Sequence, residues 1–190
     1  MMKYIPLLEL PVLIIMVAFR ALMLRKHGIK TIVFGETNKS DFIIVPIVLF
    51  FLYGISSSVF DLPFPLILKS CFLENSVLRI CAIVFCTVSL LWFFITLKIF
   101  GRSFRVGIDE NTNDTLITHG TFSMSRNPIY AAFMVFFMGI CMAYPNVITI
   151  VFFILLIVTV HRQVLREEDF LKRHYGKEYE EYCARVRRYI

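Results

Sequence analysis

The sequence lacks the short motifs that mark common soluble cofactor enzymes and hydrolases. It contains no G-x-G-x-x-G after a strand, no P-loop, no H-E-x-x-H and no G-x-S-x-G elbow. Hydride transfer on a Rossmann domain and phosphate hydrolysis at a P-loop are therefore disfavoured. The four histidines are not spaced as metal ligands, and we expect no metal site.

Paired cysteines and a basic domain are also missing. The five cysteines form no C-x-x-C pair and most lie in apolar stretches, which predicts reduced core residues. The net charge of +6 is not gathered into a domain that would bind nucleic acid, and we expect no nucleic-acid partner. It suits basic loops at an anionic membrane surface, with membrane lipid as a partner.

Charged side chains are absent from residues 127–161, a run of 35 residues between two polar segments. Such a run can cross a bilayer twice, since one crossing needs roughly 20 apolar residues or somewhat fewer. The tripeptide Tyr144-Pro145-Asn146 near its middle supplies a turn. The pattern predicts a short helical hairpin over 129–160 that brings both polar segments to one membrane surface.

The composition extends this prediction to the whole chain. Hydrophobic residues make up 58% of the sequence, against about 45–50% in soluble domains. We expect an all-α integral membrane protein with about five transmembrane helices. The predicted spans are about 4–24, 42–60, 77–100, 129–143 and 147–160. Residues 1–100 would hold the first three spans, and residues 101–190 would hold the hairpin and the two polar segments beside it.

The distribution of Lys and Arg predicts the orientation. These residues gather in the first loop, in the third loop and after residue 160. Five spans with the N-terminus outside place all three segments in the cytoplasm. We therefore expect a multi-pass protein with a cytoplasmic site, in the plasma membrane of a prokaryote or the endoplasmic reticulum of a eukaryote.

The first polar segment, 114–130, favours a binding loop. Gly120 permits a tight turn, and Asn127 before Pro128 predicts the start of a helix. A helix N-terminus offers free N–H groups and a partial positive charge to a polar or anionic ligand. The alternative is an ordinary loop with an N-cap.

The second polar segment predicts a helix over about 161–174 that ends at Gly176. At 100° per residue, Glu167 and Glu168 flank its apolar stripe, while Arg162 and Arg166 lie on the opposite, polar side. A carboxylate pair at a packed edge could bind cationic or hydroxyl groups. The alternative is a solvated helix with Arg–Glu pairs. A second amphipathic piece, 178–190, could lie on the membrane surface.

The chain resembles the isoprenylcysteine carboxyl methyltransferase family, within a wider group that includes phospholipid methyltransferases. The matching pieces are Leu116-Ile-Thr-His-Gly-Thr-Phe122, Arg126-Asn-Pro-Ile-Tyr130, Glu167-Glu168 and the tail 175–188. They stand in the family's order over about residues 114–190. The resemblance implies that residues 101–190 form the catalytic half, with a helical cofactor-binding region. Asn127 and Phe122 stand where the family usually has His and Tyr, and Asn cannot titrate near neutral pH.

The resemblance implies S-adenosylmethionine as methyl donor, with S-adenosylhomocysteine as product and no metal. By position, the implied cofactor-binding residues are Leu116, Ile117, Thr118, His119, Gly120, Phe122, Asn127, Pro128, Tyr130 and Glu167.

The implied reaction is methylation of the carboxylate of a prenylated cysteine or a similar lipid-linked acceptor. A carboxylate with a pKa of about 3.5 is already ionised, and its methylation needs no general base. Arg162 or Arg166 could hold it in two hydrogen bonds, and Arg162 is favoured because it sits where the last span leaves the bilayer. An amine acceptor on a phospholipid would instead need a proton acceptor such as Glu168 or His174.

Two other classes remain open on sequence alone. A membrane reductase of the steroid-reductase type would use NADPH and share a polar C-terminal half. A non-enzymatic scaffold or transporter component is the other alternative, although no repeat typical of transporters is visible.

Overall fold

The chain folds as an all-helical bundle, as expected, in a computed structural model that describes residues 4–26, 44–73, 75–100 and 116–190. Within these ranges no strand is present. Some predicted features lie outside the described residues. They are the first-loop cations beyond residue 26, the start of the second span at 42–43, the third-loop cations Arg102 and Arg105, and the start of the binding loop at 114–115. The elements are α1 (Ile5–Lys26), α2 (Ile44–Phe60), α3 (Leu66–Lys69), α4 (Ser76–Phe100), the 3-10 helix η4 (Gly120–Ser123), α5 (Pro128–Ala143), α6 (Val147–Tyr175) and α7 (Lys177–Arg185).

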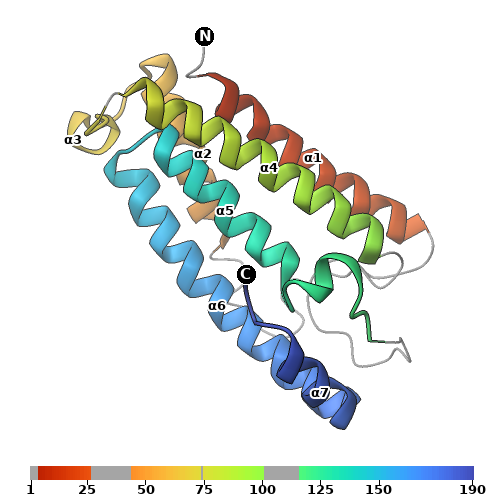
Figure 1. The fold of residues 1–190 in the computed structure, drawn as a ribbon. Coiled ribbons are helices and arrows are strands. Elements are labelled where there is room, and N and C mark those ends of the chain that lie inside the picture. The colour runs from red at the N-terminus through yellow and green to blue at the C-terminus, as the bar shows by residue number, and fades with distance from the viewer. Residues whose placement is uncertain (1–3, 27–43, 74, 101–115) are drawn as a thin grey trace.

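The long helices run side by side along one direction (Figure 1). The most extensive packing joins α4 to α5, and α1 packs on both of these helices. The α5–α6 hairpin lies beside this group, with α2 packed on α6. Beyond the bundle, α6 continues and α7 doubles back along it (Figure 1). This extension sets apart one polar end of the molecule.

Each predicted span corresponds to a helix, but the helices differ in length. By length and composition, α1, α4 and α6 are long and apolar enough to cross a membrane. The apolar parts of α2 (Val48–Phe60) and α5 (Pro128–Ala143) are shorter. The described helices thus include three candidate spans, and the five-span topology with a cytoplasmic C-terminus stays a prediction.

The fifth predicted span and the helix expected after it form one continuous element. α6 has 29 residues, and at 1.5 Å per residue it is about 43 Å long. No break separates the apolar part, up to Val160, from the polar part. The helix ends at Gly176, as predicted, where a positive φ of 53° lets the chain turn into α7.

The predicted turn of the hairpin is a well-bonded helix start. Asn146 accepts a hydrogen bond from the Thr149 amide at 3.0 Å, and its own amide donates to the Thr149 hydroxyl at 3.3 Å. This reciprocal pair is a capping box. The Asn146 side-chain amide also donates to the Ser58 hydroxyl at 3.2 Å, which fixes the turn to the end of α2.

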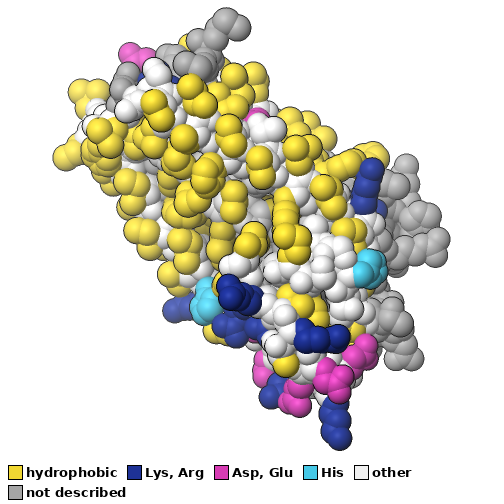
Figure 2. All heavy atoms as spheres, in the orientation of Figure 1, with side chains coloured by type: hydrophobic (Ala, Val, Ile, Leu, Met, Phe, Trp, Pro, Cys, Tyr) yellow, Lys and Arg dark blue, Asp and Glu magenta, His cyan; other side chains and the backbone are white. Residues whose placement is uncertain are grey.

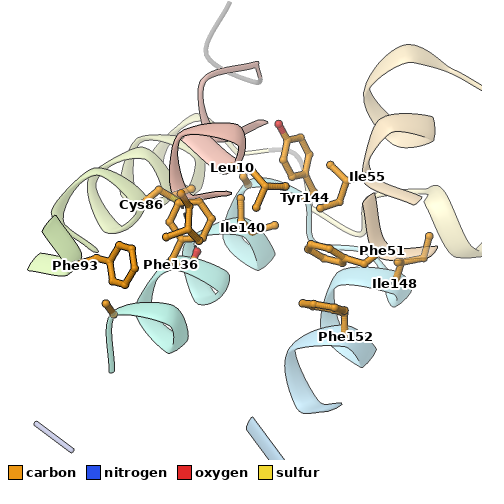
Figure 3. Packing of buried hydrophobic residues seen from close by; sticks show 14 of the residues in the cluster. Leu10, Phe51, Ile55, Cys86, Phe93, Phe136, Ile140, Tyr144, Ile148 and Phe152 are labelled. Atoms are coloured by element: carbon orange, nitrogen blue, oxygen red, sulfur yellow. Dashed lines mark hydrogen bonds between the residues drawn. The ribbon is translucent and has the colours of Figure 1, made fainter. Parts of the chain in front are cut away.

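An aromatic and aliphatic core holds the bundle together away from the polar end (Figure 3). Phe51 of α2 stacks on Phe152 of α6 with ring centroids 3.7 Å apart. Phe93 of α4 and Phe136 of α5 are fully buried. These rings join the hairpin to both α2 and α4.

The surface around this core is largely apolar (Figure 2). Exposed large side chains lie along the long helices, among them Leu8, Phe19, Leu91, Ile154 and Leu155. Charged side chains gather instead where α6 and α7 extend (Figures 1 and 2). An apolar surface of this extent suits contact with lipid and not with water.

Candidate functional site

The two polar flanks of the hairpin meet at its open end. The Tyr130 hydroxyl on the first turn of α5 donates to Glu167 Oε1 on α6 at 2.6 Å. The Asn127 side-chain amide, directly before α5, donates to Glu168 Oε1 at 3.2 Å. Four of the predicted site residues therefore form two hydrogen-bonded pairs, and the two members of each pair lie about 40 positions apart in the sequence.

Glu168 is the centre of a charged cluster. Its Oε1 also contacts the Arg126 guanidinium at 3.2 Å, and its Oε2 accepts two bonds from Arg188, at 2.9 and 2.8 Å. The side chains of Arg126 and Glu168 are only 12% and 11% exposed. Charge-assisted hydrogen bonds of this kind are short and strong. Two nitrogens of the Arg188 guanidinium contact the same oxygen of Glu168.

The segment 186–190, which we call the strap, lies across this cluster. The Arg126 amide donates to the Arg187 carbonyl at 2.9 Å. The Asn127 side-chain amide and the Ser125 hydroxyl donate to the Arg188 backbone carbonyl, at 3.2 and 3.3 Å. The Tyr189 hydroxyl lies 3.1 Å from His161 Nδ1. The predicted amphipathic piece thus folds back onto the hairpin, and its basic end is bonded to Glu168.

The predicted binding loop runs from Leu116 into η4. Leu116, Ile117 and Thr118 are half-buried, and His119 is exposed. Gly120 has a φ of 63°, and a Cβ there would lie 2.4 Å from Ile99 Cδ1. The positive φ favours glycine here, and a larger residue would also have to displace the end of the Ile99 side chain.

The end of this loop is anchored to α7. Phe122 is buried against Phe100 with ring centroids 5.1 Å apart. Its carbonyl accepts a 2.6 Å bond from the Tyr182 hydroxyl. Burial raises the pKa of Tyr182 to about 12, and the phenol therefore remains a donor at neutral pH.

The N-terminus of α5 is left open by its own cap residue. Pro128 occupies the first helical position, as predicted, and Asn127 makes no side-chain cap. The Asn127 side chain is turned instead toward Glu168 and the strap. Asn127 thus gives the first-turn amides of α5 no side-chain acceptor, and the partial positive charge of the helix end is available to a ligand.

Glu167 keeps one oxygen available. Tyr130 and Gln163 both bond to Oε1, at 2.6 and 2.9 Å. Oε2 makes no hydrogen bond with any residue that the structure describes. A carboxylate held on one side and open on the other can accept from an ammonium or a hydroxyl group.

Arg162 and Arg166 do not join this cluster. Both are exposed, and neither forms an ion pair or hydrogen bond with the described part of the chain. At 100° per residue they continue the face of α6 that exposes Leu155 and Val158. These two cations therefore follow directly after an exposed apolar stripe on the same face of α6.

An open cavity of about 350 Å³ lies between α6 and α7. Its lining includes all three members of the Arg126–Glu168–Arg188 cluster. Tyr179, only 3% exposed, also lines it, and its hydroxyl has no partner among the residues described. Burial and the nearby Glu168 carboxylate raise the pKa of Tyr179 well above its usual range.

Several residues of this site have no role predicted from the sequence. Gln163 stands four residues before Glu167, a helical spacing that could have revealed it. Arg126 and Arg188 belong to the motif segments that carry the resemblance, but neither was assigned a role. Tyr179 gave no signal beyond its place in the aromatic tail. Within the described ranges, no group of three His, Cys, Asp or Glu side chains gathers to hold a metal ion.

The fold and the site define a helical bundle with an apolar surface and a polar site at one end. Comparison with known families adds the family of the chain. The family model described as phospholipid methyltransferase matches residues 75–178. That match covers more than half of the chain, and the chain belongs to this family.

Its similarity to individual proteins is narrower. Over 89 residues it is 34% identical to the probable protein-S-isoprenylcysteine O-methyltransferase of Oryza sativa subsp. japonica, covering 45% of this chain and 47% of the relative. It is 29% identical, again over 89 residues, to protein-S-isoprenylcysteine O-methyltransferase B of Arabidopsis thaliana, covering 45% of each. The chain thus spans about half the length of the curated relatives it matches. No solved structure matches it significantly.

Proposed function

We propose that this protein is an S-adenosylmethionine-dependent methyltransferase that acts in the membrane on the carboxylate of a prenylated cysteine or a similar lipid-linked acceptor. The observation that carries the proposal is the meeting of both hairpin flanks at Glu167 and Glu168, with one Glu167 oxygen open beside an uncapped helix. The similarity to proteins named isoprenylcysteine O-methyltransferases supports the choice of acceptor.

The residues at the open end of the hairpin fit the methyl donor. Glu167 Oε2 would accept from its ammonium or ribose hydroxyls, and the first-turn amides of α5 would attract its polar end. Leu116 to Gly120 and Phe122 would line the same side, and Pro128 and Tyr130 would fix the helix end. When bound, S-adenosylmethionine supplies a methyl group already activated by a sulfonium.

The task of the protein is then alignment and the exclusion of water. Tyr130 and Gln163 hold the Glu167 carboxylate in one orientation, which limits the motion of whatever it binds. Asn127 is 8% exposed, and both acceptors of its amide belong to the protein. It would position Glu168 and the strap, and would not move a proton.

The acceptor side would lie on the lipid-facing stripe of α6. A lipid tail would pack along Leu155 and Val158, and its carboxylate would meet Arg162, with Arg166 one turn further. Both guanidiniums are exposed and without protein partners in the described chain, and neither must first break an ion pair.

A phospholipid amine is the second candidate acceptor, because the matching family model is described as phospholipid methyltransferase. An ammonium must lose a proton before methylation. Glu168, the predicted base, has both oxygens bonded by Asn127, Arg126 and Arg188, so neither oxygen is left for an acceptor amine. His174 is exposed, with its ring stacked on Phe170. This geometry favours the carboxylate.

A methyl-transfer assay tests the proposal. Purified protein and labelled S-adenosylmethionine would be offered N-acetyl-S-farnesylcysteine, its methyl ester and phosphatidylethanolamine. We expect label on the free acid, as a base-labile ester, and on neither of the others. Transfer to phosphatidylethanolamine alone would select the second candidate, and no transfer together with no binding of S-adenosylhomocysteine would reject both.

Variants of α6 test the acceptor side separately. Arg162→Ala should raise the KM for the farnesylated acid roughly tenfold or more, which is the loss of one charge-assisted contact. Binding of S-adenosylhomocysteine should not change. Arg173→Ala, on the same face but paired with Asp169, is the matched control. Unchanged kinetics in Arg162→Ala would remove Arg162 from the acceptor site.

A further inference from the structure

The cavity between α6 and α7 contains a cluster in which arginines outnumber carboxylates. Two guanidiniums, of Arg126 and Arg188, share the single carboxylate of Glu168. The other charged groups at the cavity are paired on its exposed edge, Lys172 with Glu180 at 3.2 Å and Asp169 with Arg173 at 3.6 Å. Within the Arg126–Glu168–Arg188 cluster, two guanidiniums are therefore paired with one carboxylate, and Arg126 and Glu168 are nearly buried.

The same cavity has hydrogen-bond donors without acceptors. The Tyr179 hydroxyl and Arg126 Nε are both buried, and neither has a partner among the residues described. Buried polar groups are normally satisfied, and leaving one unpaired costs about 1–3 kcal/mol. An arginine Nε and a phenol whose pKa is raised offer protons to an oxygen acceptor.

Arg188 is held ready for such a ligand. Its Nε and one terminal nitrogen bond to Glu168 Oε2, and the bonds to Glu168 raise its pKa above the ordinary value. Its side chain is 37% exposed, so part of the guanidinium still faces the cavity. The strap carbonyls bonded to Arg126, Ser125 and Asn127 fix its backbone.

We propose that the cavity lined by Arg126, Tyr179 and Arg188 is a binding site for the oxyanion group of a water-soluble ligand, a carboxylate or a phosphate. The volume of about 350 Å³ lies within the usual range for small-molecule sites. An anion there would lie beside both guanidiniums and would be the acceptor that Arg126 Nε and the Tyr179 hydroxyl lack among the described residues.

The position of the cavity favours a ligand from the water phase. Glu168 stands eight residues beyond Val160, or about 12 Å along α6. A headgroup layer is only about 5–8 Å thick on each side of the hydrocarbon core. With α6 near the membrane normal, the cavity lies beyond the reach of most lipid phosphates.

Two sources could supply this chemistry. One is the carboxylate of the methyl donor, because Arg126 directly precedes the cap of α5, where the donor is proposed to bind; this source rests on the proposed function. The other is a free anion that binds independently of methyl transfer. The charge and donor arguments are the same for both.

Equilibrium dialysis of the purified full chain in detergent separates the sources. The probes are S-adenosylhomocysteine, its analogue without the carboxyl group, and inorganic phosphate. The variants are Arg188→Gln and Tyr179→Phe, with Arg185→Gln as the matched control, since Arg185 is exposed on α7 and does not line the cavity.

If the donor is the source, wild type should bind S-adenosylhomocysteine roughly tenfold or more tightly than the analogue, and Arg188→Gln should abolish that preference. If a free anion is the source, wild type should bind phosphate, and Arg188→Gln should weaken it roughly tenfold without affecting S-adenosylhomocysteine. Tyr179→Phe should weaken the same probe by several-fold, since it removes a single hydrogen bond and leaves no buried charge.

The proposal is overturned if both cavity variants, shown to be folded by thermal unfolding, bind every probe as wild type does, or if Arg185→Gln weakens binding equally. Phosphate binding without any S-adenosylhomocysteine binding would retain the anion site and reject the proposed function.

Discussion

The two ends of the α5–α6 hairpin each begin a helix with an asparagine, and use it in opposite ways. Asn146 at the turn caps α6 with its side chain and is fully buried. Asn127 at the open end leaves α5 uncapped and directs its amide to Glu168 and Arg188. The turn is closed by uncharged groups, while the open end is held by charges and keeps its helix amides available.

This difference separates structure from function within one motif. A satisfied cap stabilises a helix but leaves nothing for a ligand. At the open end, the first-turn amides of α5 and one oxygen of the Glu167 carboxylate lack side-chain partners among the described residues. These groups can form hydrogen bonds with a bound molecule. Substitutions at the turn should therefore change stability alone, and those at the open end should change stability and binding together.

The largest effect should come from Glu168→Ala. The change leaves Arg126 as a nearly buried charge without its carboxylate, which costs about 3–5 kcal/mol. We expect a clear drop in the melting temperature in detergent and loss of S-adenosylhomocysteine binding. The Glu168→Gln variant keeps the shape of the side chain but loses its charge, and it should also be less stable than wild type. Wild-type stability in both variants would show that the pairing of Glu168 with Arg126 and Arg188 does not stabilise the fold.

A paired substitution tests the comparison directly. Asn146→Ala and Asn127→Ala should each destabilise by about 2 kcal/mol, one through a lost cap and the other through lost hydrogen bonds. Only Asn127→Ala should weaken S-adenosylhomocysteine binding, measured by equilibrium dialysis. Equal binding losses in the two variants would show that the two ends are not functionally distinct.

Tyr130→Phe should have a smaller effect on stability. It removes the 2.6 Å bond to Glu167 but keeps the ring, at a cost of about 1.5 kcal/mol. Glu167 would retain only Gln163, and we expect S-adenosylhomocysteine affinity to fall several-fold. Ile129→Val, its neighbour on α5, is the control; the same loss there would point to general loosening of the helix.

The smallest effect concerns pH. The folded pKa of Tyr182 is about 12, above its ordinary value of 10. Between these values the unfolded phenol ionises and the folded one does not, so its contribution to stability falls as the pH rises from about 10 to about 12. Tyr182→Phe should flatten this part of the stability profile, measured by thermal unfolding against pH. An unchanged slope would exclude Tyr182 as its cause.

Much of the helical framework could be predicted from the sequence because apolar runs and turn residues are local signals. The uncharged run with Pro145 and Asn146 predicted the hairpin, and Gly176 predicted the end of α6. The continuity of α6 across Val160 does not follow from the sequence, because a change from apolar to polar composition indicates a boundary although it does not interrupt backbone hydrogen bonding.

The site was less accessible to such reasoning. The pairing of residues 127 and 130 with the two glutamates follows from the hairpin, but the strap does not. Its bonds use the backbone carbonyls of residues 187 and 188, which any residue would supply, across a separation of about 60 positions. The sequence around Arg188 therefore does not predict its pairing with Glu168. Arg162 is a candidate on sequence alone because it directly follows the apolar run.

The unbroken course of α6 has a mechanical consequence. From Val160 to Tyr175 the helix extends about 22 Å past its apolar part, and a rigid rod transmits rotation along its length. A tilt of about 10° in the membrane, a modest response to a change in bilayer thickness, would displace the far end by about 4 Å. Glu167 and Glu168 lie about halfway along this extension, and the same tilt would change their spacing from the first turn of α5 by up to about 2 Å.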